Sequence, residues 1–216
     1  MFFIHNLFDD PYYFFSSLLL VVFSICTHEF VHAWAALREG DTTAADAGHL
    51  TFNPFVQMGV WSLIMFLLCG IAWGQVPVNP SRMRHGRRSA AWVALSGPLS
   101  NFGLFLIFSS VAAVGYYFES EGLWQLMARG AVLNVILAVL NLLPIPGLDG
   151  WAVVVNYFPR LLAKVNNEVL AGVTIGLVLL LFIKGFVWLE YLGYWGTGLA
   201  VWGWTYGIDW IARFFF

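Results

Sequence analysis

The chain has 216 residues, of which 60% are hydrophobic and 10% are charged, and its formal net charge is −2. Because a soluble domain carries about 25% charged residues, this composition excludes an ordinary soluble protein and indicates an integral membrane protein. The basic residues are few and lie near the ends of apolar segments, so nothing supports binding to nucleic acid. We expect one membrane domain over residues 1–216, with a catalytic core at about residues 12–160 and additional membrane segments over residues 165–216.

The first apolar segment, residues 12–37, is long enough to cross a bilayer and contains no Lys or Arg. No basic residue precedes it, unlike in a signal peptide, so we expect the segment to remain in the mature protein. It contains the HExxH motif HEFVH at residues 28–32. Side chains four residues apart share one face of a helix, so His28 and His32 can bind one Zn²⁺ ion and supply two of its three protein ligands. Glu29 is then placed to act as the general base of a hydrolase.

An HxxxH pair by itself arises by chance in many helices and is then structural. Here the histidines and Glu29 lie within an apolar segment, where polar groups are costly, and this favours a functional role. One alternative, a membrane di-iron oxygenase, needs several histidine clusters, whereas this chain has five histidines and one such pair. A second alternative, a scaffold or transporter that only binds a metal, would not require Glu29.

Further apolar segments lie at about residues 55–73, 90–117, 123–143, 169–189 and 194–216. The last one is rich in Trp, Tyr and Gly and is either a span or an interfacial helix. The expected fold class is therefore an all-α polytopic membrane protein with about five to six membrane segments.

Short loops that carry Lys and Arg are expected in the cytoplasm. The acidic N-terminus and the turn at Glu119 and Glu121 are expected outside. The positions expected inside are Arg38, Arg82, Arg84, Arg87, Arg88, Arg160, Lys164 and Arg213. If Arg38 and Arg82 lie on one side, residues 55–73 cannot form a simple crossing. We therefore predict that this segment, which follows the HExxH helix, is re-entrant or a pair of short broken helices.

The third metal ligand must come from elsewhere in the chain, and Asp149 is the best candidate. It follows a proline-rich break after the fourth segment, at the same membrane side as His32. His49, in the polar stretch after the first span, is a candidate contact to substrate or metal. Asn141 could donate a hydrogen bond to an oxyanion or to the substrate, or alternatively hold two helices together. We expect the latter, structural role for Asn134.

Four stretches of the chain resemble the site-2 proteases, a family of intramembrane zinc metalloproteases. They are HEFVH at residues 28–32, GHLTFNP at 48–54, SGPLSN at 96–101 and NLLPIPGLDG at 141–150. The resemblance implies Zn²⁺ held by His28, His32 and Asp149, with Glu29 as the general base and Asn141 near the substrate. It also implies hydrolysis of a peptide bond in or next to a transmembrane segment of a membrane protein.

The resemblance further implies a protein of a prokaryotic cell membrane whose active site opens towards the cytoplasm. The chain is similar to the compact branch of the family, because it offers no room for a PDZ domain or a regulatory domain. Gly147 stands where relatives often have proline before Leu-Asp-Gly, which leaves the ligand intact. A transmembrane substrate must unwind before it is cut, and we expect an edge strand over residues 44–51 to pair with it. The physiological substrate and the oligomeric state do not follow from the sequence.

Overall fold

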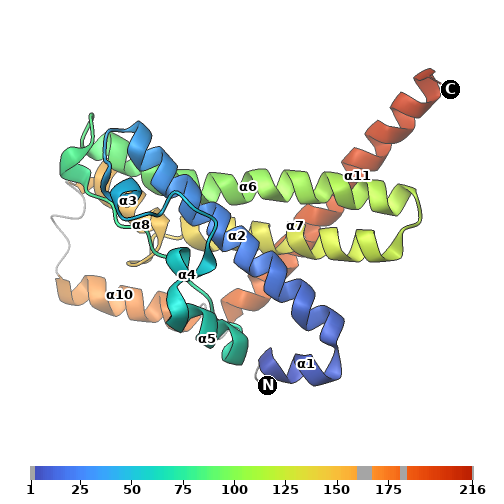
Figure 1. The fold of residues 1–216 in the computed structure, drawn as a ribbon, viewed down its shortest axis with the longest axis horizontal. Coiled ribbons are helices and arrows are strands. Elements are labelled where there is room, and N and C mark those ends of the chain that lie inside the picture. The colour runs from blue at the N-terminus through green and yellow to red at the C-terminus, as the bar shows by residue number, and fades with distance from the viewer. Residues whose placement is uncertain (1–2, 160–166, 181–183, 216) are drawn as a thin grey trace.

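The computed structural model of the protein describes residues 3–159, 167–180 and 184–215, and every regular element within these ranges is a helix (Figure 1). The expected all-α fold is confirmed. Three helices are long and apolar enough to cross a membrane: α2 (Pro11–Arg38), α6 (Arg87–Tyr117) and α7 (Glu121–Leu142). Arg160 and Lys164, which we expected in the cytoplasm, lie outside the described residues.

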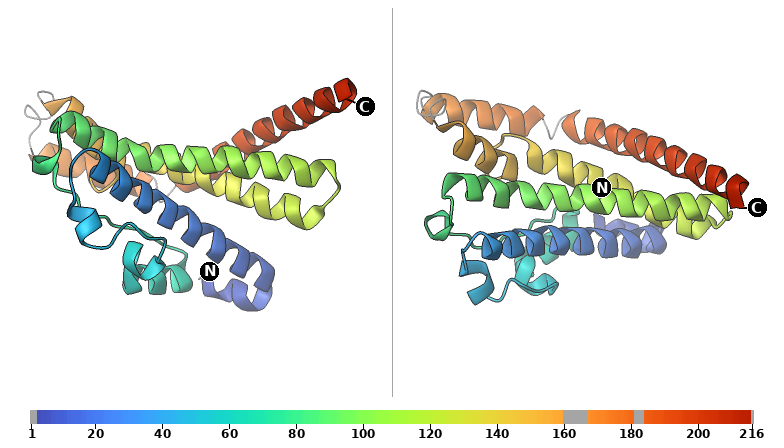
Figure 2. Two further views of the ribbon diagram at one scale, coloured as in Figure 1. Left: turned by 45° about the horizontal axis from the view of Figure 1, so that its top comes forward. Right: turned by 90° about the horizontal axis from the view of Figure 1, so that it is seen from above.

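The three long helices form the frame that positions the rest of the chain. Helix α2 begins at Pro11 because the Asp10 side chain accepts a hydrogen bond from the backbone N–H of Tyr13 at 2.9 Å, a standard N-terminal cap. Helix α6 packs against both α2 and α7, and α7 returns antiparallel to α6 after a short turn (Figure 2). Helix α6 starts at the end of the bundle where α2 finishes, and α7 brings the chain back to that end.

The remaining elements are shorter, apart from the last. They are η1 (Phe3–His5), α1 (Asn6–Asp9), α3 (Thr43–Asp46), α4 (Pro54–Gln57), α5 (Gly59–Cys69), η2 (Pro80–Arg82), α8 (Asp149–Tyr157), α10 (Asn167–Leu180) and α11 (Phe186–Phe215). The expected segment at 169–189 overlaps α10 and the start of α11, and that at 194–216 falls within α11 except for its last residue. Neither helix is among the three candidate spans of the described part of the chain.

The segment after α2 turns back on itself, as the distribution of charge predicts. Helix α5 has 11 residues, or roughly 16 Å at 1.5 Å per residue, about half of a bilayer core of about 30 Å. The chain reverses at Gly70, whose φ of +77° suits glycine. It then runs back along α5, where Ser62 Oγ accepts from Trp73 N at 2.9 Å and donates to Trp73 O at 2.6 Å. The predicted re-entrant segment is confirmed.

Two further backbone contacts fix the return of this segment. The N–H of Gln75 donates to the carbonyl of Gln57 at 3.0 Å, and the N–H of Arg84 donates to the carbonyl of Glu39 at 2.8 Å. The second contact joins the residue after α2 to the loop before α6. Arg38 and the basic loop at residues 82–88 therefore lie at one end of the bundle.

The opposite end carries the acidic turn between α6 and α7. Asp209 of α11 lines a pocket there together with Glu119 and Glu121. Arg213 follows Asp209 by one helical turn in α11, so it lies at this end and not with Arg38. The expectation that Arg213 shares a membrane side with Arg38 is wrong, because α11 carries the chain away from the basic loop.

The expected edge strand over residues 44–51 is also wrong. Residues Thr43–Asp46 form helix α3. Beyond it, the carbonyls of His49 and Thr51 accept hydrogen bonds from the side chain of Gln57 at 2.8 and 2.6 Å. The backbone of this stretch, which we expected to pair with substrate, instead binds the side chain of Gln57 at the start of the re-entrant segment.

Asp41 links the two ends of the re-entrant segment through hydrogen bonds to Thr43 and Asn79. Its side chain is fully buried; Oδ1 accepts from the backbone N–H of Thr43 at 3.0 Å and from its hydroxyl at 2.5 Å, and Oδ2 accepts from the N–H of Asn79 at 2.5 Å. Burial raises the pKa of Asp41, but these hydrogen bonds to the carboxylate outweigh it and hold the pKa below its ordinary value of 3.8.

We expect Asp41→Asn to lower the thermal stability of the protein at neutral pH. A group with a depressed folded-state pKa stabilises the fold above its unfolded pKa, and this stabilisation is lost as the pH falls through the folded-state pKa. The difference in melting temperature between wild type and Asp41→Asn should therefore be largest above pH 5 and shrink below pH 3.8. Thermal unfolding in detergent between pH 3 and pH 7 measures it, with the exposed Asp46→Asn as control. A constant difference at every pH would contradict this role.

Candidate active site

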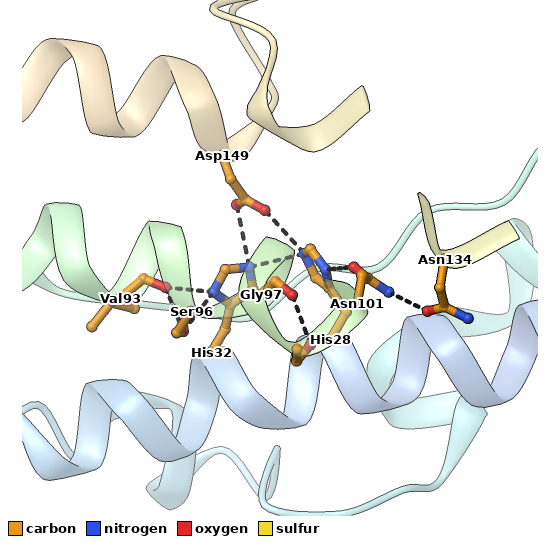
Figure 3. Close-up of polar contacts among 9 residues, drawn as sticks. His28, His32, Val93, Ser96, Gly97, Asn101, Asn134 and Asp149 are labelled. Carbon is orange, nitrogen blue, oxygen red and sulfur yellow. Dashed lines mark hydrogen bonds and ion pairs between the residues drawn. The ribbon is translucent and has the colours of Figure 1, made fainter. Parts of the chain in front are cut away.

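The three predicted metal ligands meet between α2 and α8 (Figure 3). His28 and His32 project from adjacent turns of α2, and Asp149 is the first residue of α8. His28 Nε2 lies 3.0 Å from Asp149 Oδ2, and His32 Nε2 lies 3.2 Å from Asp149 Oδ1. One candidate ligand atom from each residue lies within 4.8 Å of the other two. Both histidines are buried, and Asp149 is partly buried.

Each imidazole is oriented by a hydrogen bond at Nδ1. His32 Nδ1 lies 2.7 Å from the carbonyl oxygen of Val93, which can only accept, so the proton of His32 sits on Nδ1. His28 Nδ1 lies 2.5 Å from Asn101 Oδ1. The amide nitrogen of Asn101 donates to Asn134 Oδ1 at 2.9 Å, which assigns the amide oxygen to His28. Both Nδ1 atoms are therefore engaged as donors, and both Nε2 atoms are directed at the site, where a neutral imidazole offers its lone pair to a metal.

In the neutral form that binds a metal, the two imidazoles direct Nε2 lone pairs into the same space. The two Nε2 atoms are 3.0 Å apart, and in this form they cannot share a hydrogen bond. Asp149 Oδ2 is buried, and no hydrogen-bond donor among the described residues satisfies it. Buried lone pairs that converge without a donor are costly, and a cation relieves this cost. Two imidazole nitrogens and a carboxylate suit Zn²⁺.

Gly97 of α6 leaves room for such an ion. A Cβ atom at this position would contact the Nε2 atoms of both His28 and His32. The chain passes so close because α6 crosses α2 here through a run of small residues, in which Ser96 and Pro98 are also buried. Any larger residue than glycine would occupy the point at which the ligand atoms converge.

The hydrogen-bond network continues from the histidines into the bundle. Asn134 of α7 donates to Ser24 Oγ of α2 at 2.9 Å and to the carbonyl of Gly130 at 2.8 Å. Its expected interhelical hydrogen bond is therefore present. Asn101, Asn134 and Ser24 all have an exposed fraction of 0%, so the network is shielded from solvent. It connects α2, α6 and α7 behind His28.

Glu29 lines a cavity of about 430 Å³ beside the three ligands. The returning part of the re-entrant segment, residues 72–76, forms one wall of this cavity. A Cβ atom at Gly74 would contact the carboxylate of Glu29, so the backbone of this wall passes directly over the proposed base. Glu29 is 8% exposed, which leaves its carboxylate a small opening to the cavity.

The other predicted site residues divide into two groups. Asn141 lines the same cavity as Glu29 and Asp149. His49 does not join the ligand cluster, since its Nδ1 pairs with Gln57 Oε1 at 3.1 Å. Sequence reasoning missed Asn156 of α8, which also lines the cavity, and the orienting role of Asn101. In the sequence, Asn101 and Asn156 stand out only as polar amides within or next to apolar helices. This feature does not by itself show what an amide contacts.

Comparison with known proteins identifies relatives that are named as zinc metalloproteases. The chain is 33% identical to YwhC of Bacillus subtilis over 171 residues, which cover 75% of this chain and 78% of YwhC. It is 36% identical to Rip2 of Mycobacterium tuberculosis over 136 residues and 35% identical to Rip2 of Mycolicibacterium smegmatis over 135 residues. The chain spans about half the length of these Rip2 proteins.

No family model and no solved structure matches the chain. The similarity to YwhC nevertheless extends over most of both proteins, and the three candidate spans agree with a membrane enzyme. The chain therefore belongs to the site-2 protease family of intramembrane zinc metalloproteases.

Proposed function

We propose that the protein hydrolyses a peptide bond in or next to a transmembrane segment of a membrane protein, using Zn²⁺ held by His28, His32 and Asp149. One observation carries this proposal most directly. One candidate ligand atom from each of His28, His32 and Asp149 converges within 4.8 Å of the others, beside a buried glutamate at the edge of a cavity.

In the proposed mechanism, His28, His32 and Asp149 would hold Zn²⁺, which would supply the Lewis acidity that lowers the pKa of a water molecule and polarises the scissile carbonyl. Glu29 takes the proton of the attacking water on its carboxylate and delivers it to the nitrogen of the leaving amine. Asn101 and the Val93 carbonyl keep the two imidazoles in the tautomer that can bind the metal. Asn141, from its place on the cavity wall, donates its amide N–H to the oxygen of the substrate carbonyl.

The position of the cavity supports a transmembrane substrate. It lies between α2, α7 and the re-entrant segment, and its walls include the apolar residues Ile25, Val76, Leu137 and Leu140. The carbonyls of a helical substrate are already hydrogen-bonded within the helix, so the segment has to unwind locally before it enters. An extended stretch of mainly apolar residues fits the space that this cavity offers.

The orientation of the site rests on the distribution of charge. The ligands lie towards the end of the bundle that carries Arg38 and the basic loop at residues 82–88. Loops rich in Arg face the cytoplasm, so the proposed active site opens towards the cytoplasm of a prokaryotic cell. His49 pairs with Gln57 and has no proposed chemical role.

Replacing Asp149 with alanine tests the proposed function. Two histidines alone leave the ion without its third protein ligand, so purified Asp149→Ala should contain far less zinc than wild type and should not cleave a reconstituted transmembrane substrate. Metal analysis of the purified protein and a cleavage assay measure these two effects. Asp46→Ala, which removes an exposed carboxylate, is the control. Stoichiometric zinc in Asp149→Ala would exclude Asp149 as a ligand.

Asn101→Ala should weaken zinc binding by about 10- to 100-fold, the usual effect of removing a partner that orients a ligating histidine. Asn101→Asp keeps an acceptor for His28 Nδ1 and should retain most of the affinity. Competition with a zinc chelator measures the affinity, and Ser100→Ala, on the neighbouring residue, is the control. Equal affinity in wild type and Asn101→Ala would show that this hydrogen bond does not fix His28.

A further inference from the structure

An arginine of α7 lies towards the end of the bundle away from the proposed metal site. Arg129 belongs to α7 and packs on the first turns of α2. The Cζ atom of Arg129 lies 5.1 Å from the ring centroid of Tyr13 and 5.6 Å from that of Tyr12. Its Nη1 donates to Ser16 Oγ at 3.3 Å. The start of α2 and the start of α7 lie close to the same end of the molecule in Figure 1.

The guanidinium of Arg129 is poorly satisfied by the protein. It carries five N–H donors, and the contact to Ser16 is the one hydrogen bond found for it among the described residues. Within that part of the chain no carboxylate oxygen lies within 4.0 Å of it. Two acids near this end have other partners: Asp10 caps α2 through Tyr13 N, and Glu121 accepts from the Gln125 side chain. The charge therefore has open hydrogen-bonding capacity.

The surroundings keep this capacity accessible from the membrane. Arg129 is half-buried, while Tyr12 and Tyr13 are 50% and 39% exposed, so the two rings flank the guanidinium without covering it. Tyr12 is held in place by a contact of its hydroxyl with the carbonyl of Gly122 at 3.5 Å. Arg129 lies eight residues after Glu121, or roughly 12 Å along α7. At such a depth an arginine side chain extends towards the headgroup layer.

We propose that Arg129, Tyr12, Tyr13 and Ser16 form a binding site for the phosphate of a phospholipid headgroup, in the leaflet opposite the basic loop. A planar guanidinium binds two phosphate oxygens side by side. Tyrosine side chains favour the interface between lipid and water, where such a headgroup lies. A bound phosphate would contact residues of both α2 and α7. It would therefore add to the link that the Arg129–Ser16 hydrogen bond makes between these two helices.

Lipid titration of the purified, zinc-loaded protein tests this proposal. Phosphatidylglycerol should raise the melting temperature of wild type and remain bound in native mass spectrometry, whereas diacylglycerol with the same acyl chains should do neither. Arg129→Gln should weaken phosphatidylglycerol binding by at least about tenfold, because the lost hydrogen bonds join two charged groups. Arg88→Gln, an exposed arginine at the other end, is the matched control and should bind as wild type does.

Arg129→Lys distinguishes a loss of lipid binding from a folding defect, because lysine keeps the positive charge but lacks the planar guanidinium. It should bind phosphatidylglycerol more weakly than wild type and more strongly than Arg129→Gln. Equal lipid binding by wild type and Arg129→Gln would overturn the proposal, and so would equal stabilisation by diacylglycerol. Stabilisation by glycerol 3-phosphate in place of the lipid would overturn the assignment to a headgroup and assign the site to soluble phosphate esters.

Discussion

Glu29→Gln is expected to abolish most of the proteolysis while leaving zinc in place. Glutamine has nearly the shape of glutamate but cannot accept the proton of an attacking water, and loss of a general base lowers turnover by about 10²- to 10⁴-fold. The zinc content should not change, because Glu29 lies outside the group of three possible ligands. Cleavage of a reconstituted transmembrane substrate and metal analysis of the same preparation measure the two effects.

The expected separation of activity from metal binding makes this variant informative. Glu121→Gln removes an exposed carboxylate at the opposite end of the bundle and serves as the control. Loss of zinc together with activity would show that Glu29 holds the metal or the fold. Unchanged cleavage would exclude Glu29 as the base, and absence of cleavage by wild type and Glu29→Gln alike would favour a membrane protein that binds metal without hydrolysing peptides.

The architecture followed from the sequence where it depends on local periodicity and on charge. The spacing of four residues put His28 and His32 on one face of a helix whatever the rest of the chain does. The short basic loops required residues 55–73 to turn back, and the structure has α5 followed by a reversal at Gly70. Both inferences use constraints that the bilayer imposes on any chain.

The parts that escaped prediction depend on contacts between distant segments. Asn101 and His28 are 73 residues apart, and a single sequence does not show which buried amide will face which histidine. Residues 44–51 mix small residues with the polar Asp46, His49 and Thr51, a pattern that suits an edge strand as well as the helix and loop that are found. Arg213 was placed by a rule about loops, although it lies within α11.

Gly97→Ala is the second change from which we expect a large effect. It keeps every proposed ligand and tests whether the metal needs the space beside Gly97. The added Cβ would contact the Nε2 atoms of both histidines, at the point where the proposed ligand atoms converge. Zinc affinity should fall by more than the about 10- to 100-fold that follows loss of an outer hydrogen-bond partner, and proteolysis should fall with it. Chelator competition and the cleavage assay measure these effects.

The extra methyl group of Gly97→Ala acts on the fold in two opposite ways. Alanine is favoured over glycine in a helix by about 1 kcal/mol, but the two buried imidazoles have to shift against their hydrogen bonds at Nδ1. The metal-free melting temperature of Gly97→Ala and of wild type therefore separates a loss of the metal site from a loss of the fold. Gly103→Ala is the matched control, since the same change in the same helix meets no atom within 4 Å and should leave zinc binding intact. Normal zinc binding by Gly97→Ala would mean that the ion sits elsewhere, and the proposed role of the two histidines and Asp149 would then be excluded.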